Sequence, residues 1–211
     1  MKTSIALKTL LGAGALTLPL MAFAESNVQT GAATAAPGAT AHVDFSIVIP
    51  KILYLRVGAG STYTSGTLTS ANAIDLITFS PAAGTVGNGT AVAGTGGDLA
   101  GGVETAAIVS NSGNVTLNAT ASGALSDGNG DTIPFTQITT AATTLTSATQ
   151  LPAPVLTNGT SSNVVLTAPA TKLIVEDAKW TYSFANSANV PGGTYGGVAN
   201  SGRVTYTATM P

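Results

Sequence analysis

Apolar and polar residues alternate in several short stretches of this sequence, and the clearest of them is His42–Ile49. Every second residue there is apolar: Val43, Phe45, Ile47 and Ile49. A period of two predicts a strand with one buried face. Pro50 follows, and because proline has no N–H to donate, we expect two short strands or one bent edge strand instead of a continuous central strand. The second piece is Ile52–Val57.

The same alternation returns near the C-terminus. Within Leu173–Phe184 the largest side chains, Trp180, Tyr182 and Phe184, fall on one face, which predicts the centre of the core. The last strand is expected over residues 203–210. One face of that strand carries Val204, Tyr206, Ala208 and Met210, and the other carries Arg203 and three threonines. The chain is therefore expected to end inside a strand.

Turn residues separate the remaining short apolar stretches. Val103–Ser110 and Asn114–Thr120 flank Asn111-Ser112-Gly113, which predicts a β-hairpin. After residue 24 no long segment carries a helical apolar stripe. About 8–10 short strands with almost no helix predict an all-β fold: a two-sheet antiparallel sandwich with Ig-like, Greek-key connections. A barrel or a β-solenoid is the alternative, although the sequence has no fixed-period repeat.

The N-terminal residues have the pattern of an export signal. Lys2 and Lys8 precede and open an apolar run that ends near Leu20, and Ala22-Phe23-Ala24 forms a small-residue cleavage site. We therefore predict a signal peptide over residues 1–24, and no membrane span in the mature chain. Residues 25–41 are small and polar and are expected to form a disordered leader. Residues 42–211 then make one sandwich domain.

Composition narrows the possible partners and the location. Charged residues are 8% of the chain and cysteine is absent, so packing and backbone pairing must stabilise the domain. Residues 25–211 hold five basic and nine acidic residues, a net charge of −4, with no basic cluster. This argues against nucleic acid as a partner. An exported, cysteine-free domain fits the periplasm, the cell surface or the extracellular space of a Gram-negative bacterium.

Few residues could carry chemistry. The only histidine, His42, lies at the margin of the leader, and Ala124–Gly128 is the nearest approach to a nucleophile elbow but has alanine in place of its first glycine. We therefore expect no enzyme and no cofactor. Adjacent Glu176 and Asp177 should point to opposite faces of a strand and not act as a pair. Tyr54, Tyr63 and Tyr195 are interpreted as packing residues, with a sugar-binding surface as the alternative.

One turn has part of a calcium pattern. Asp127, Asn129 and Asp131 have the i, i+2, i+4 spacing that presents oxygen atoms to calcium. Thr132 replaces the loop glycine, and Ile138 stands where the bidentate glutamate belongs. A hairpin turn is the preferred interpretation, and these three residues remain the calcium candidates.

The two ends of the chain resemble bacterial fimbrial subunits. The run Gly192-Gly193-Thr194-Tyr195-Gly196-Gly197, followed after Val198–Ser201 by the alternating residues 203–210, is similar to the terminal strand motif of those proteins. In cysteine-free chaperone-usher pilins, an N-terminal extension with alternate apolar residues completes the Ig-like sandwich of the next subunit. The resemblance implies that role for Val43, Phe45, Ile47 and Ile49, and a periplasmic chaperone as a further partner.

Two functions follow from these patterns. The leading hypothesis is a non-enzymatic structural subunit of a surface fibre or matrix that self-associates by β-strand addition. The rival is a monomeric exported binding domain. The sequence leaves open whether residues 41–49 pair within their own chain or in a neighbouring copy.

Overall fold

The computed structural model describes residues 26–32, 38–59 and 74–211. The predicted signal peptide and Tyr63 lie outside these ranges. Two units are distinguished: Met1–Ile49, and Pro50–Pro211, which we call the body. Residues 42–49, called here the tail segment, form no strand. Among the described residues, no helix is both long enough and apolar enough to cross a membrane.

The body is all-β with antiparallel sheets, which confirms the predicted fold class. Three single 3₁₀ turns occur, η1 (Ala83–Thr85), η2 (Phe135–Gln137) and η3 (Val198–Asn200), and the described residues contain no α-helix. The strands, several of them only two residues long, are β1 (Leu53–Val57), β2 (Ile77–Thr78), β3 (Val92–Ala93), β4 (Thr95–Gly96), β5 (Val103–Ser110), β6 (Val115–Ala121), β7 (Leu125–Ser126), β8 (Thr132–Ile133), β9 (Ile138–Thr143), β10 (Val164–Leu166), β11 (Ile174–Phe184) and β12 (Val204–Thr209).

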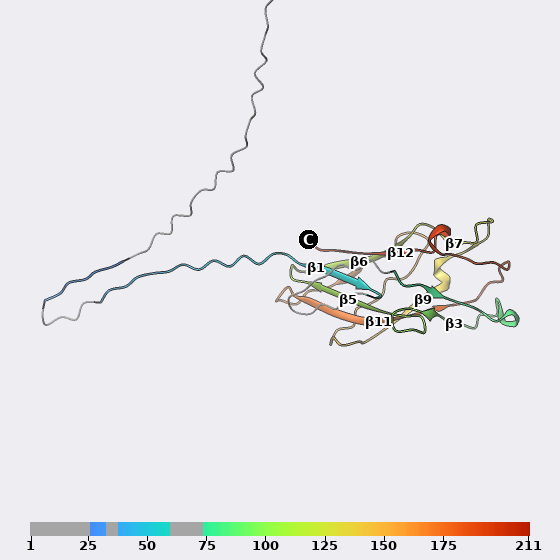
Figure 1. Ribbon diagram of the computed structural model, residues 1–211, viewed down its shortest axis with the longest axis horizontal. Coiled ribbons are helices and arrows are strands. Elements are labelled where there is room, and N and C mark those ends of the chain that lie inside the picture. The colour runs from blue at the N-terminus through green and yellow to red at the C-terminus, as the bar shows by residue number, and fades with distance from the viewer. Residues whose placement is uncertain (1–25, 33–37, 60–73) are drawn as a thin grey trace, which may run out of the picture. The chain divides into compact units, whose positions relative to one another are not determined.

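The larger sheet is built around the eleven-residue strand β11. β5 pairs with the first part of β11, β3 pairs with its last two residues, and β9 pairs with the opposite edge. β1 pairs with β5 and forms one border of the sheet. Figure 1 shows β5 and β11 lying side by side in this layer. The alternation within Leu173–Phe184 accounts for this long strand, because its inward face holds the largest apolar side chains.

The smaller sheet has three strands in the order β10, β6, β12. Its central strand β6 alternates strictly between buried and half-buried residues. The core lies between this sheet and the larger one, where side chains from β6 pack with those of β5 and β11. Trp180 is fully buried there, and its Nε1 donates a hydrogen bond to the carbonyl oxygen of Leu151 at 3.0 Å.

The predicted hairpin over residues 103–120 is wrong. β5 pairs with β1 and β11, whereas β6 pairs with β10 and β12, so the two strands lie in different sheets. The connection at Asn111–Gly113 crosses from one sheet to the other, and the Asn111 side chain binds the chain just before β1. Both strands have a buried face, and placing them in opposite sheets lets those two faces pack against each other.

Candidate functional site

The tail segment leaves its apolar side chains in solvent. The four alternate residues of the sequence pattern are between 74% and 89% exposed, with Phe45 at the upper end. Val48, on the other face of the same segment, is also 89% exposed. Single exposed apolar residues are ordinary, but a run of them with strand periodicity marks a segment suited to pairing with another sheet.

β12 is an edge strand with an incompletely covered face. It pairs with β6 on one side, and no described strand pairs with its other side. Its threonines Thr205, Thr207 and Thr209 are exposed, while its inward residues are only half-buried: Val204, Tyr206, Ala208 and Met210. The inward residues of the neighbouring central strand β6 are at most 6% exposed. The difference follows from position, because β12 pairs with a described strand on one side only, whereas β6 pairs with a strand on each side.

β1 is the corresponding edge of the larger sheet, and it lies close to β12. Its inward residues Leu53, Leu55 and Val57 are also half-buried and pack on the core. The inward residues of both strands, taken together, are called here the β1–β12 seam. At one end, Lys51 just before β1 donates through Nζ to the carbonyl oxygen of Pro211 beyond β12 at 3.0 Å. Beside it, the hydroxyl of Ser110, the last residue of β5, lies 3.7 Å from the Met210 sulfur.

Tyr206 fixes β12 to the core. Its ring lies 5.3 Å from that of Trp180, and its hydroxyl is 2.8 Å from the hydroxyl of Tyr182. Burial raises the pKa of Tyr206 to about 12 and also raises the pKa of Tyr182, so both phenols are neutral hydrogen-bonding groups at ordinary pH. Phe184, the third residue of the predicted core face, is 8% exposed and packs against Phe79. β12 is therefore anchored, although its edge is open.

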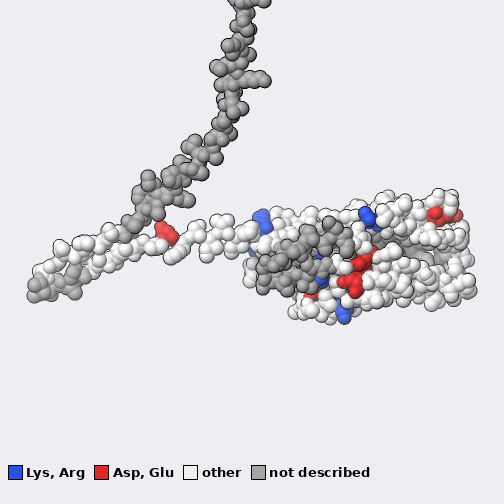
Figure 2. Space-filling view, in the orientation of Figure 1, with Lys and Arg blue, Asp and Glu red and all other residues white. Residues whose placement is uncertain are grey.

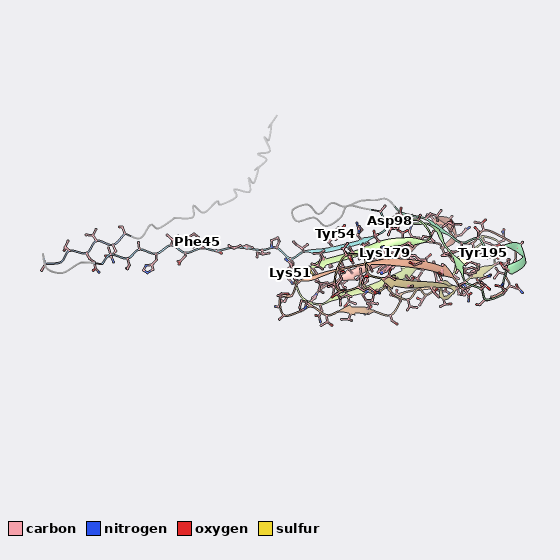
Figure 3. All side chains as sticks on the ribbon, turned by 90° about the horizontal axis from the view of Figure 1, so that it is seen from below. Phe45, Lys51, Tyr54, Asp98, Lys179 and Tyr195 are labelled. Atoms are coloured by element: carbon pink, nitrogen blue, oxygen red, sulfur yellow. The ribbon has the colours of Figure 1, made fainter. Side chains whose placement is uncertain are left out.

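Few residues of the body are charged, and some of these lie on or beside β1, including Arg56 and Lys51. On the face of the body drawn in Figure 2 most of the described side chains are uncharged, and the charged ones form a few small groups, as expected from a composition with 8% charged residues. In Figure 3, Lys51 lies at one end of the body and Tyr195 at the other. Lys51 therefore marks the end of the body at which β1 begins and β12 finishes. Where a strand is added to a sheet edge, main-chain hydrogen bonds give affinity and pockets for alternate side chains give specificity.

Three carboxylates meet near the end of β1. Glu104 is 5% exposed and accepts a hydrogen bond from the Asp98 amide, while Asp98 binds the amide and hydroxyl of Thr105, and Asp75 binds the amide of Ala59. Burial, followed by the negative charges of Asp75 and Asp98, raises the pKa of Glu104 to about 7. Within the described residues, no group of three or more potential ligands has metal-site geometry. The cluster serves to join β1 to the turn before β5.

The calcium candidates form a turn between β7 and β8. The Asp127 carboxylate accepts hydrogen bonds from the Asn129 amide at 2.8 Å and the Asp131 amide at 3.1 Å. The bond from the Asn129 amide is the main reason that the pKa of Asp127 is lowered. The oxygens of Asp127 are thus used to close the hairpin.

The other candidate side chains also have structural roles. Asp177 accepts hydrogen bonds from Ser147 and Thr146, and although burial alone raises its pKa, these bonds lower it to about 2. Glu176 has a raised pKa because of burial, and it faces the inner side of the sheet, opposite to Asp177. Tyr195 donates its hydroxyl to the Pro191 carbonyl oxygen at 2.8 Å. None of these places an acid and a base around a common cavity.

One hollow lies beside the free edge of β9. It measures about 290 Å³ and is lined only by uncharged residues: Thr136, Ile138, Thr139, Thr140, Ala153, Pro154, Val155 and Leu156. The Thr140 hydroxyl is buried there without a hydrogen-bond partner. Ligand sites usually add a few convergent polar groups to an apolar wall, and one buried hydroxyl without a partner does not make such a set.

Sequence reasoning missed two parts of the site. It did not find that β1 lies beside β12, because strands near opposite ends of the chain leave no local signal of their proximity. It also treated Asn111 as an ordinary turn residue, although its side chain binds both Pro50 and Ile52. Comparison with known proteins adds no identity: no family model matches the chain, and no match was found among curated proteins or solved structures.

Proposed function

We propose that this chain is a non-enzymatic structural subunit of a surface fibre or extracellular matrix, assembled by β-strand addition. In the proposed junction, the tail segment of one copy pairs with the free edge of β12 in another copy. The observation that carries the proposal is the half-buried inward face of β12, an anchored strand that pairs with a described strand on one side only.

The two partners match in length and pattern. The tail segment has four apolar residues at alternate positions from Val43 to Ile49, and β12 with its next residue has four from Val204 to Met210. At a rise of about 3.3 Å per residue, each span is roughly 20 Å long. A strand formed by the tail segment would therefore run along the whole edge of β12, with one apolar side chain beside each inward residue.

Both main-chain and side-chain terms favour such a junction. The unpaired N–H and C=O groups of an edge strand are a template for another strand. Burying an apolar side chain of this size contributes about 1.5–3 kcal/mol, but ordering each residue of a free segment costs roughly 1–2 kcal/mol. The side chains alone therefore do little more than offset the ordering cost, and the backbone ladder supplies the specificity of register and the remaining affinity.

Assembly outside the cytoplasm follows from the expected signal peptide and from the resemblance to fimbrial subunits. An open edge is prone to unspecific pairing before the correct partner arrives. The proposal therefore includes an exported chaperone that covers the β12 edge until the tail segment of another copy replaces it.

The test compares the chain that starts at Glu25 with a chain that starts at Pro50, using light scattering over a range of concentrations. The longer chain should form oligomers whose size grows with concentration. The shorter chain should stay free of ordered oligomers, should aggregate slowly through its open edge, and should be rescued by a synthetic peptide of residues 41–49. A peptide with Phe45 and Ile47 both replaced by aspartate is the control and should not rescue.

The rival function, a monomeric exported binding domain, predicts the opposite result. It gains support if the longer chain remains a monomer at high concentration while residues 41–49 are protected from hydrogen exchange. The tail segment would then complete its own body, and the hollow beside β9 would be the first place to look for a ligand.

A further inference from the structure

Three hydrogen bonds tie the chain that enters β1 to one residue, Asn111. The Ile52 amide donates to Asn111 Oδ1 at 2.8 Å, and Asn111 Nδ2 donates to the Pro50 carbonyl oxygen at 2.8 Å. The backbone of Asn111 adds a third bond, from its amide to the Ile52 carbonyl oxygen at 3.3 Å. Three backbone groups of residues 50–52 thus bind one residue at the end of β5.

This pattern of bonds requires an extended chain. In a strand, the C=O of one residue and the N–H of the residue two places later point to the same side. The side-chain amide of Asn111 therefore takes the place of a peptide group in a partner strand. It continues the β1–β5 ladder beyond the pair Leu53–Ser110. Pro50 is compatible with this arrangement because only its carbonyl oxygen is used.

The extended residues 50–52 follow directly after the tail segment, which ends at Ile49, and they limit where the tail segment can run. To lie along its own β1–β12 seam, the tail segment would have to reverse direction between Ile49 and Leu53. The proline ring fixes φ of Pro50 near −65°, which excludes it from the first central position of the two-residue turns that hairpins prefer. A reversal built from residues 50–52 would have to break the bonds of Pro50 and Ile52 to Asn111.

We propose that Asn111 is a positioning residue that prevents the tail segment from completing its own body and so reserves it for a second copy of the chain. This inference rests on the proposed function and adds the reason why pairing occurs between copies. It also gives a role to the Asn111 side chain, which binds the residues just before β1 and does not close a hairpin between β5 and β6.

The test uses cysteine pairs, since the chain has no cysteine of its own. Ser46→Cys lies between the apolar residues of the tail segment, and Thr207→Cys lies on the exposed face of β12. A short bifunctional maleimide joins them. A chain with both cysteines gives a fast-migrating internal product if pairing is within the chain, whereas a mixture of single-cysteine chains gives dimers only if pairing is between copies.

With Asn111 intact, the mixture should give dimers and the double-cysteine chain should give little internal product. Asn111→Ala removes both side-chain bonds and should raise the ratio of internal to intermolecular product about tenfold or more. Asn111→Asp keeps the acceptor for Ile52 and should fall between the two. Asn114→Ala is the matched control. Asn114 lies at the end of the same connection between β5 and β6, but its side chain accepts a bond from the Ala168 amide and none from residues 50–52, so the ratio should not change.

A second variant does not depend on Asn111. Inserting about six Gly/Ser residues between Ile49 and Pro50 gives the tail segment a flexible turn and should also produce the internal product, with the Asn111 bonds left in place. If Asn111→Ala and this insertion both give the same intermolecular dimers as the native chain, the role of Asn111 is overturned and the fibre proposal stands. If the native chain gives no intermolecular dimers, the fibre proposal itself is overturned.

Discussion

Replacing Phe45 by aspartate separates assembly from folding. Phe45 is 89% exposed in the structure, so the substitution removes almost no packing from the chain that carries it. In the proposed junction, by contrast, the phenylalanine would be buried against the inward face of β12. Its loss would remove about 2–3 kcal/mol of apolar burial, and an unpaired carboxylate at that position would add a further desolvation cost.

These values predict that the dissociation constant of the junction rises by about 100-fold or more. The denaturation midpoint of the body should not change. Val48→Asp is the matched control, because Val48 has the same exposure as Phe45 but lies on the other face of the segment. A carboxylate there would point away from the core and should weaken the junction much less.

The assay is sedimentation velocity for the oligomer distribution, combined with urea denaturation for the body. The proposed junction predicts that Phe45→Asp abolishes the oligomers and that the Val48→Asp chain still forms most of them. Equal effects of the two substitutions would show that the tail segment acts by general hydrophobicity, and an effect of Phe45→Asp on the urea midpoint would show that it packs on its own body.

Three further predictions concern the body. Trp180→Ala should destabilise it by about 3–5 kcal/mol in urea denaturation, because a fully buried indole is lost, and native emission typical of exposed indole would refute this. Glu104 has a folded pKa raised to about 7, so the free energy of unfolding should fall by on the order of 1–2 kcal/mol, after solvent screening, as pH rises from about 4.5 to 7. Glu104→Gln should flatten this dependence of the unfolding free energy on pH, and an unchanged dependence would contradict the assignment. Asp177 has a folded pKa lowered to about 2, so its contribution is complete above about pH 4 and is lost as pH falls towards 2; Asp177→Asn should weaken acid denaturation over that window in a circular-dichroism titration, and the native profile in this variant would count against the Ser147 and Thr146 bonds.

The fold class could be predicted because strand patterns are local. Alternation at β6, β11 and β12, with no helical stripe, was sufficient to predict an all-β sandwich. The partner of each strand could not be predicted in the same way. The connection at Asn111–Gly113 has a composition suited to a hairpin, but the buried faces of β5 and β6 pack against each other across the core, and that tertiary preference decides the path of the chain.

Only part of the candidate site could be predicted from the sequence. The apolar alternation of the tail segment and of β12 can be read directly, but exposure cannot, because the same pattern describes a strand paired in the core. Similarly, the spacing of Asp127, Asn129 and Asp131 gives no indication that their backbone amides already occupy the Asp127 carboxylate. Whether a carboxylate oxygen can bind a metal ion depends on the hydrogen bonds that it accepts within the turn. The spacing of residues in the sequence does not show those bonds.

The pairing of the tail segment with β12 is tested most directly by hydrogen exchange on the chain starting at Glu25, measured at low and high concentration. As oligomers form, the amides of residues 43–49 and the β12 amides that point away from β6 should become protected together and to the same degree. Oligomers in which β12 still exchanges freely, or a monomer in which residues 43–49 are already protected, would contradict assembly through the tail segment and the β12 edge.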